Sequence, residues 1–240
     1  MAKHTVSYGE KEITFELQRK KVKNINLRIK PDMSILVSAN KNVPLEVIEG
    51  FIRQKGAWIY KHLEYFKEFQ ANKPAKKEYI SGESFRYLGR QYRLRVRKSE
   101  IETVKYFRGF IYLYVKDPDD IKRKEKLYNQ WLNERASIHF NNSLDRMYEL
   151  VKNFNIPRPE MKIRQMKSRW GSCHREKKVI VLNSDLIKTP KYCIDYVMLH
   201  ELIHFKHRYH DKEFYNFLAS LMPDWKQRKK ALDEEVIKGI

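Results

Sequence analysis

The sequence predicts an α+β fold, in which an antiparallel sheet and a helix come first and a more helical part with a small sheet follows. Short stretches in which apolar and polar residues alternate predict the strands, and longer segments with apolar residues at helical spacing predict the helices. The hydrophobic content of 42% is ordinary for a globular protein. No run of 18 apolar residues occurs, so we expect no membrane span.

The N-terminal part, residues 1–72, is predicted to hold a small antiparallel sheet and one helix. Alternating apolar residues predict three strands, at residues 13–17, 25–29 and 35–37. Pro44 then opens a helix whose apolar residues keep helical spacing as far as Phe66. The polar and proline-containing residues 72–77 are predicted to be a linker.

Residues 78–117 form a predicted strand-rich middle part. One strand covers residues 92–97, where three apolar residues alternate with Arg93, Arg95 and Arg97, and another covers residues 110–115. The strand should therefore carry a row of arginines on one face. Three interpretations stay open: the row binds phosphates, it is a solvated face, or it guards a sheet edge against aggregation.

The C-terminal part, residues 118–240, is predicted to begin with a long helix that ends near residue 155, with a break near residues 141–143. Strands at residues 161–163 and 179–182 follow, and they flank a tight turn at Trp170-Gly171-Ser172 that uses the freedom of glycine. A further helix is predicted to start with Thr189 as its N-cap and Pro190 in its first turn. Its apolar residues recur at helical spacing: Ile194, Val197, Met198, Leu202 and Phe205.

The stretch His200-Glu201-Leu202-Ile203-His204 lies on this last helix and predicts a zinc hydrolase site. Positions four apart share one helical face, so His200 and His204 can both direct a ring nitrogen at one metal ion. Glu201 stands beside them and is placed to act as the general base for a water molecule. A histidine pair buried without a metal or another partner would be costly.

A catalytic zinc site needs a third protein ligand and one open position. Two histidines after His204 compete for that role, His207 and His210. If His210 is the ligand, the chain must leave the helix after His204, because an unbroken helix would carry residue 210 roughly 15 Å along its axis. Asp211 is expected either to orient a histidine or to cap a helix that starts at Lys212.

Several motifs make the sequence similar to one known family, the YgjP-like metallopeptidases, which are predicted metal-dependent hydrolases. The residues that carry the resemblance are Arg169-Trp170-Gly171-Ser172-Cys173, Leu182-Asn183, Ile194-Asp195-Tyr196-Val197, His200 to His204, His210 and Phe214. The resemblance implies a zincin-like metallopeptidase core and one zinc ion per chain. It also implies that His200, His204 and His210 bind the zinc and that Glu201 is the catalytic acid and base.

Zincin-like peptidases bind an extended substrate along a strand beside the metal-binding helix. The strand Val179–Asn183 is the candidate for that role in this chain. We take Arg169, Trp170 and Asn183 as candidate substrate-binding residues. Arg169 would bind a carboxylate or phosphate, or else form a structural ion pair.

The formal net charge of +20 broadens the choice of substrate and partner. A zinc-dependent peptidase is the first hypothesis, and a divalent-metal nucleotide pyrophosphatase, which hydrolyses nucleoside triphosphates, is the alternative. A third hypothesis is a zinc protein that binds nucleic acid through its basic surface. The opening residues contain no apolar run of the kind found in signal peptides, so we expect none. The chain has two cysteines, Cys173 and Cys193, and we expect a reduced, cytoplasmic protein.

Overall fold

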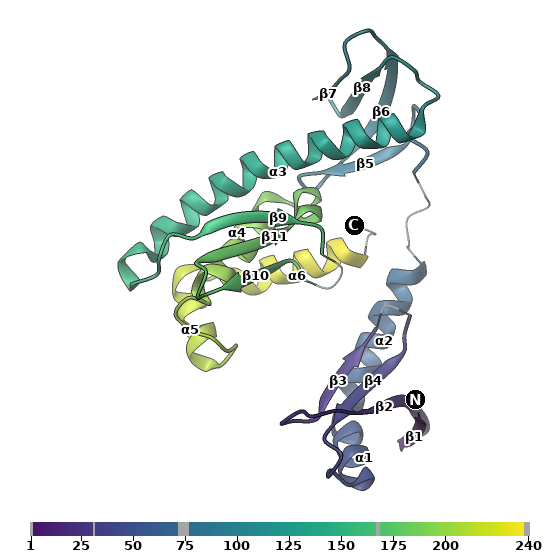
Figure 1. The fold of residues 1–240 in the computed structure, drawn as a ribbon, viewed down its shortest axis with the longest axis vertical. Helices are drawn as coiled ribbons and strands as arrows, with labels where there is room; N and C mark the ends of the chain where they lie inside the picture. Colours follow the sequence, from purple (N-terminus) through teal and green to yellow (C-terminus); the bar gives the residue numbers. More distant parts are fainter. Residues whose placement is uncertain (1, 31, 72–76, 167–168, 238–240) are drawn as a thin grey trace. The chain divides into compact units, whose positions relative to one another are not determined.

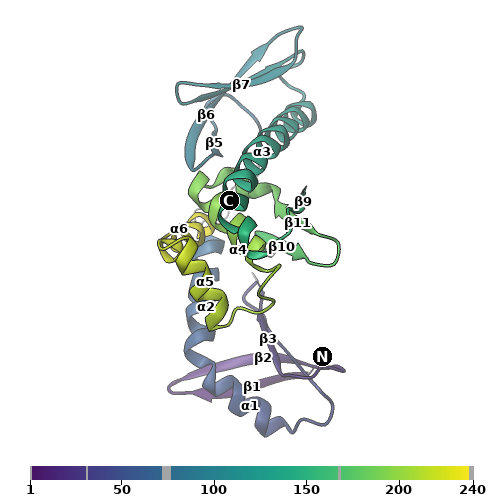
Figure 2. The same ribbon diagram turned by 90° about the vertical axis from the view of Figure 1, so that its left-hand side faces the viewer.

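The computed structural model describes residues 2–30, 32–71, 77–166 and 169–237 (Figure 1, Figure 2). The chain divides into two compact units, residues 1–74 and residues 75–236, and each has its own hydrophobic core. Apart from Lys77, the predicted linker lies outside the described residues. None of the described helices combines the length and the hydrophobicity that crossing a membrane requires.

The first unit contains a four-stranded sheet and two helices. Its elements are β1 (Ala2–Tyr8), β2 (Lys11–Arg19), β3 (Asn26–Ile29), β4 (Ile35–Ala39), α1 (Leu45–Gln54) and α2 (Gly56–Ala71). The strand order is β1-β2-β4-β3, and β2 and β4 run parallel. The prediction of a purely antiparallel sheet was therefore wrong in this detail. The reason is that β3 and β4 form a hairpin and it is β4, the second strand of that hairpin, that lies beside β2.

The helix predicted after Pro44 is two helices, α1 and α2, that meet at Lys55. The backbone N–H of Lys55 bonds to the carbonyl oxygens of Phe51 and Ile52, which closes α1. Gly56 then begins α2 against the ring of Tyr8. A Cβ atom at Gly56 would lie 2.4 Å from that ring, so the close approach requires glycine.

The second unit begins with a sheet and a long helix. These elements are β5 (Ser84–Tyr87), β6 (Arg90–Lys98), β7 (Thr103–Phe107), β8 (Phe110–Val115) and α3 (Ile121–Val151). The sheet order is β5-β6-β8-β7, and one face packs on α3 through side chains such as Leu94 and Leu113. The strands of residues 78–117 thus share one hydrophobic core with the helices that follow. The domain boundary predicted between residues 117 and 118 stays a prediction.

The long helix α3 is unbroken, so the predicted break near residues 141–143 was wrong. Asp120 caps its N-terminus by accepting a hydrogen bond from the backbone N–H of Arg123. Asn141 bonds to the carbonyl oxygen of Ser137 one turn earlier, so this polar group is satisfied within the helix. Asn155, with φ 59°, ends the short 3-10 turn that follows α3.

The rest of the second unit is a small sheet and three helices. The elements are β9 (Glu160–Arg164), β10 (Gly171–His174), β11 (Val179–Asn183), α4 (Lys191–Ile203), α5 (Lys212–Leu221) and α6 (Trp225–Ile237). The strand order is β10-β11-β9. Pro190, and not Thr189, occupies the N-cap position of α4, and the Thr189 hydroxyl instead bonds back to Leu186. The α+β fold class predicted from the sequence is confirmed.

A polar contact fixes α4 against α3. The carboxylate of Asp195 on α4 accepts hydrogen bonds of 2.6 Å from the hydroxyl of Ser143 and from the guanidinium of Arg146, both on α3. Ser143 is fully buried, so its hydroxyl needs this partner. The long helix therefore holds the helix that carries His200 and Glu201.

Candidate metal centre

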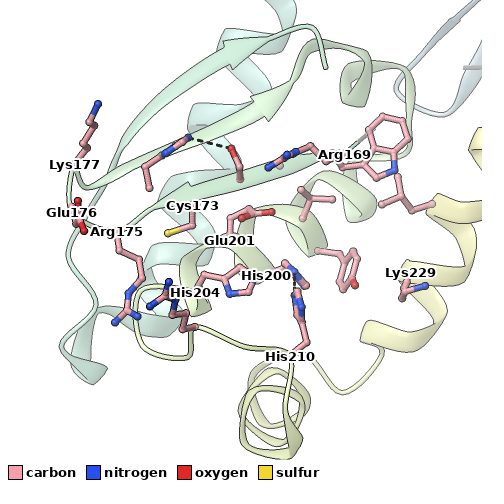
Figure 3. A pocket seen from close by; sticks show the side chains of 18 of the residues that line it. Arg169, Cys173, Arg175, Glu176, Lys177, His200, Glu201, His204, His210 and Lys229 are labelled. Carbon is pink, nitrogen blue, oxygen red and sulfur yellow. Dashed lines mark hydrogen bonds between the residues drawn. The ribbon is translucent and has the colours of Figure 1, made fainter. Parts of the chain in front are cut away.

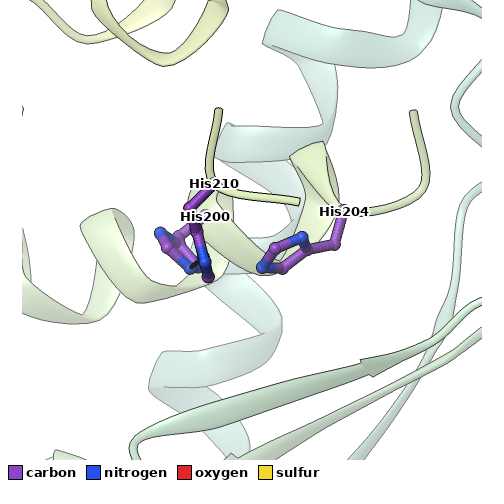
Figure 4. Close-up of side chains that lie close together, drawn as sticks. All are labelled: His200, His204 and His210. Carbon is purple, nitrogen blue, oxygen red and sulfur yellow. Dashed lines mark hydrogen bonds between the residues drawn. The ribbon is translucent and has the colours of Figure 1, made fainter. Parts of the chain in front are cut away.

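The histidine-bearing end of α4 is buried on the side that faces the core. Leu199, Leu202 and Ile203 are fully buried around it. His200 lies in the last turn of α4, and His204 occupies the C-cap position. The helical spacing thus brings both rings to one side, as Figure 4 shows, with ring centroids 4.9 Å apart.

The chain leaves the helix at His204 without a glycine or proline. The backbone N–H groups of Phe205, Lys206 and His207 bond to the last carbonyl oxygens of α4 and thus tighten its final turn. Arg175, next to the end of β10, donates to the carbonyl oxygen of Phe205 at 3.0 Å and holds the turn in place. This turn carries the chain back to the side where the first two histidines lie.

The return of the chain places His210 beside the other two histidines. The candidate ligand atoms of His200, His204 and His210 all lie within 4.8 Å of one another. Asp211 follows as the N-cap of α5, where its carboxylate accepts a hydrogen bond from the N–H of Phe214, as one of the two alternatives predicted. His207 is not part of this group, and its ring packs against Phe217 instead.

The hydrogen bonds of the rings indicate which nitrogen atoms are free. Nδ1 of His204 lies 3.0 Å from the carbonyl oxygen of His207, which can only accept, so the proton is on Nδ1 and Nε2 is left as a ligand. Nε2 of His200 and Nε2 of His210 face each other at 2.8 Å. Two nitrogens bound to a tetrahedral zinc ion are roughly 3.3 Å apart, so these rings need only a small adjustment to share one.

The protonation of the three rings also fits a metal site. Burial lowers the pKa of His200 to about 3, and it lowers the pKa of His204 and of His210 as well. All three imidazoles are therefore neutral near pH 7, with lone pairs available for a metal ion. Nδ1 of His200 is buried and has no hydrogen-bond partner among the described residues.

The side chain of Phe214 packs against all three histidine rings. Its fully buried ring lies 4.9 Å, 4.9 Å and 4.8 Å from the rings of His200, His204 and His210, measured between centroids. An apolar ring offers no hydrogen bond to these nitrogens. It therefore limits the positions of the rings while leaving their lone pairs free.

Glu201 lies in the same cavity as the histidines, as Figure 3 shows, and is only 6% exposed. Burial raises the pKa of Glu201 to about 8, and the positive charge of Arg169 opposes that shift. Gly171 makes room for the carboxylate, because a Cβ atom there would lie 2.6 Å from Oε1 of Glu201. Gly171 and Ser172 lie in strand β10, so the tight turn predicted at Trp170-Gly171-Ser172 was wrong.

Cys173 contributes a thiol to the cavity lining. Burial raises its pKa to about 12, with a further contribution from Glu201. The thiol is therefore protonated near neutral pH, which makes it a poor nucleophile and a poor metal ligand. This environment favours a packing role for Cys173.

The three candidate substrate-binding residues have different positions. Arg169 and Trp170 line the cavity, and Arg169 is exposed. Asn183 is buried: its amide donates to the carbonyl oxygens of Met166 and Arg169 and accepts from the N–H groups of Met166 and Asp185. The structure thus gives Asn183 a structural role in holding the chain before β10, and its amide has no free group for a substrate.

The strand Val179–Asn183, β11, is the central strand of its sheet. It pairs with β10 on one side and with β9 on the other, so a substrate cannot add to it. The expectation that this strand binds substrate was wrong, because strand order is not visible in the sequence. The edge strands are β10 and β9, and the four residues of β10 all line the cavity.

The cavity has a volume of about 1020 Å³, and its lining includes residues that were not predicted to be site residues. Tyr196 lies one turn before His200 on α4, and their ring centroids are 5.9 Å apart. The same four-residue spacing that relates His200 to His204 could have found it. Lys229 and Asp233 come from α6, and no signal near the motif indicates them.

Comparison with known proteins identifies the family of the chain. A family described as "YgjP-like, metallopeptidase domain" matches residues 23–235 of the chain. Two solved zymogens of metallopeptidases share weak likeness: abylysin of Pyrococcus abyssi, with 17% identity over 42% of this chain and 98% of its own, and jannalysin of Methanocaldococcus jannaschii, with 22% identity over 40% and 88%. Their TM-scores are 0.37 and 0.35. No curated protein matches the chain. Because the match to this family covers most of the chain, the chain belongs to the YgjP-like metallopeptidase family.

Proposed function

We propose that the protein is a zinc-dependent peptidase. The observation that carries the proposal is the group of three neutral imidazoles, at His200, His204 and His210, in a cavity that also holds a buried carboxyl group. Three nitrogen ligands with an open position are typical of catalytic zinc. Magnesium and calcium prefer sets of oxygen ligands, which this group does not offer.

The chain's own residues would divide the work of hydrolysis between them. The three histidines would hold the metal ion, which would supply the Lewis acidity that makes water a nucleophile near neutral pH. Glu201 in its ionised form, which the positive charge of a bound metal ion would favour, would accept a proton from the attacking water and return it to the leaving amine. The burial of Glu201 beside Gly171, at the start of β10, would keep bulk water away from that proton.

The edge of β10 is the proposed binding site for the peptide backbone. Gly171 to His174 pair with β11 along one edge, and no strand among the described residues pairs with the other. An extended peptide can therefore add to the sheet through main-chain hydrogen bonds. Arg169 would then bind a carboxylate of the substrate near the start of the strand.

A nucleotide substrate is the second candidate, because cations outnumber acids in the cavity lining. The basic lining residues are Arg169, Arg175, Lys177, Arg208 and Lys229, and the acidic ones are Glu176, Glu201 and Asp233. Such a lining would attract the phosphates of a nucleoside triphosphate. The same metal group would then serve a pyrophosphatase.

Metal analysis combined with substrate screening tests the proposal. We expect about one zinc ion per chain in the wild type and in Glu201→Gln, and a large loss of zinc in His204→Ala. The zinc-loaded wild type should cleave peptides from a mixed library, and Glu201→Gln should not. Release of pyrophosphate from nucleoside triphosphates without peptide cleavage would favour the second candidate. A protein that binds no zinc after reconstitution would contradict both.

A further inference from the structure

The sheet β5–β8 has one face that the core does not use. Along β6 and β8 the inward side chains, such as Leu94, Ile111 and Leu113, are fully buried against α3. The alternate side chains point to the opposite face. We call this surface the outer face and define it by Arg93, Arg95 and Arg97 of β6 and by Phe110, Tyr112 and Tyr114 of β8.

The strand register places a row of arginines next to a row of aromatic rings. Arg93 pairs with Phe110, Arg95 with Tyr112 and Arg97 with Tyr114. Within the aromatic row, the centroids of Phe110 and Tyr112 are 6.1 Å apart, and those of Tyr112 and Tyr114 are 6.4 Å apart. Positive charges and flat rings therefore alternate across the sheet and repeat evenly along it.

The arginines of this row are available for a ligand. All three are exposed, and none forms an ion pair within the described part of the chain. The segment of residues 84–115 contains eight Lys or Arg but only two Glu, and Glu102 is already paired with Arg123. The guanidinium of Arg95 lies over the ring of Phe110, 4.7 Å from its centroid. The outer face is therefore strongly positive.

The position of the row excludes the protection of a sheet edge as its purpose. Charged residues that prevent aggregation lie on edge strands. Here the edges are β5 and β7, whereas the arginines and aromatic rings lie on the two central strands, β6 and β8. A merely solvated face would not explain three aromatic side chains beside the arginines, since none of those three packs in the hydrophobic core.

We propose that the outer face of the sheet β5–β8 binds single-stranded nucleic acid. Arg93, Arg95 and Arg97 would contact successive phosphates, and Phe110, Tyr112 and Tyr114 would stack on bases. A duplex keeps its bases stacked inside, so it could use the arginines but not the rings. An acidic peptide could likewise pair with the arginines, but its carboxylates would not supply a series of aromatic bases to stack on the rings. The proposal does not depend on the metal centre or on the proposed peptidase activity.

Binding of labelled oligonucleotides by the full-length protein tests this proposal. Single-stranded DNA and RNA of about ten nucleotides are compared with a duplex by fluorescence anisotropy over about 50 to 200 mM salt. The triple variant Arg93→Gln, Arg95→Gln, Arg97→Gln should weaken single-strand binding strongly and reduce the salt slope by about 2, since each phosphate contact contributes about 0.7. The matched control removes the same charge from another basic cluster through Lys20→Gln, Lys21→Gln and Lys23→Gln.

The aromatic row needs its own variants, which keep the charge. Tyr112→Leu and Tyr114→Leu should each weaken single-strand binding about 5- to 150-fold and leave the salt slope unchanged. If single-stranded DNA and RNA bind with different affinities, the comparison identifies which of the two the protein prefers. Three results would overturn the proposal: no binding of single strands, equal losses in the arginine variant and the lysine control, or aromatic variants that bind as the wild type does. Single arginine variants carry the same test if the triple variant does not fold.

Discussion

The contact between Gly171 and Glu201 predicts that Gly171→Ala displaces the proposed general base. A Cβ atom at Gly171 would lie 2.6 Å from Oε1, 2.7 Å from Cγ and 2.9 Å from Cδ of Glu201. Non-bonded carbon atoms are normally about 3.5–4.0 Å apart, so the glutamate stem must move by about 1 Å. Gly171 does not have a positive φ, so the substitution introduces no backbone strain of its own.

The size of the effect follows from this displacement. Overpacking a filled site costs about 1–3 kcal/mol, which should appear as a lower free energy of unfolding. Displacing a catalytic group by about 1 Å lowers activity about 100-fold. Zinc content should stay as in the wild type, because the substitution touches none of the three histidines. The variant thus separates metal binding from placement of the base.

A double-mutant cycle checks the contact between Gly171 and Glu201 without depending on the substrate, and an activity assay checks the displacement of the base. Urea unfolding is measured for the wild type, Gly171→Ala, Glu201→Ala and the double variant. In the Glu201→Ala background the added methyl group has space, so Gly171→Ala should cost close to nothing. Gly50→Ala is the matched control, because no atom lies within 4 Å of the Cβ position there. Equal destabilisation in both backgrounds, or full peptidase activity in Gly171→Ala, would refute the reasoning.

Three further predictions follow from the site and its supports. Removing zinc with a chelator should lower the melting temperature of the wild type, because a bound metal ion stabilises the folded state. The melting temperature of His204→Ala should not change, because this variant has little zinc to lose. Equal shifts of the two proteins in calorimetry would contradict this prediction. Asp195→Ala should destabilise by about 1–3 kcal/mol, since it leaves the buried Ser143 hydroxyl unpaired, and Asp195→Asn should cost less; urea unfolding measures both. Burial lowers the pKa of His139 from 6.5 to about 4, so below pH 6.5 the unfolded chain takes up a proton that the folded chain refuses. The free energy of unfolding should therefore fall between pH 6.5 and pH 4 by about 1–2 kcal/mol more in the wild type than in His139→Gln, a magnitude that allows for the partial exposure of His139. Identical pH profiles of unfolding for the two proteins would contradict this effect of His139.

The sequence predicted the parts of the site that depend on local spacing. The four-residue interval between His200 and His204 fixes a shared helical face, and the residues of α4 favour a buried helix. Asp211 also acts locally, since a carboxylate just before a helix accepts from the backbone N–H three residues later. The family resemblance supplied His210, whose place depends on a turn that no glycine or proline marks.

The parts that the sequence did not predict depend on contacts between distant segments. Nothing in residues 179–183 shows that this strand is central, because strand order is set by pairing with residues 160–164 and 171–174. In the same way, the reason for glycine at position 171 is a side chain 30 residues later, and a single sequence does not show that contact.

The arginine row shows how strand pairing changes the meaning of a pattern that the sequence displays plainly. The alternation in residues 92–97 predicts that three arginines share a face, but it fits a phosphate site, a solvated face and a guarded edge equally well. The parallel pairing of β6 with β8 brings Phe110, Tyr112 and Tyr114 beside the arginines and makes both strands central. Because the two strands are joined through β7, the sequence alone does not reveal that they are neighbours. Charge and rings together are what distinguish a surface for single strands from one that attracts any polyanion.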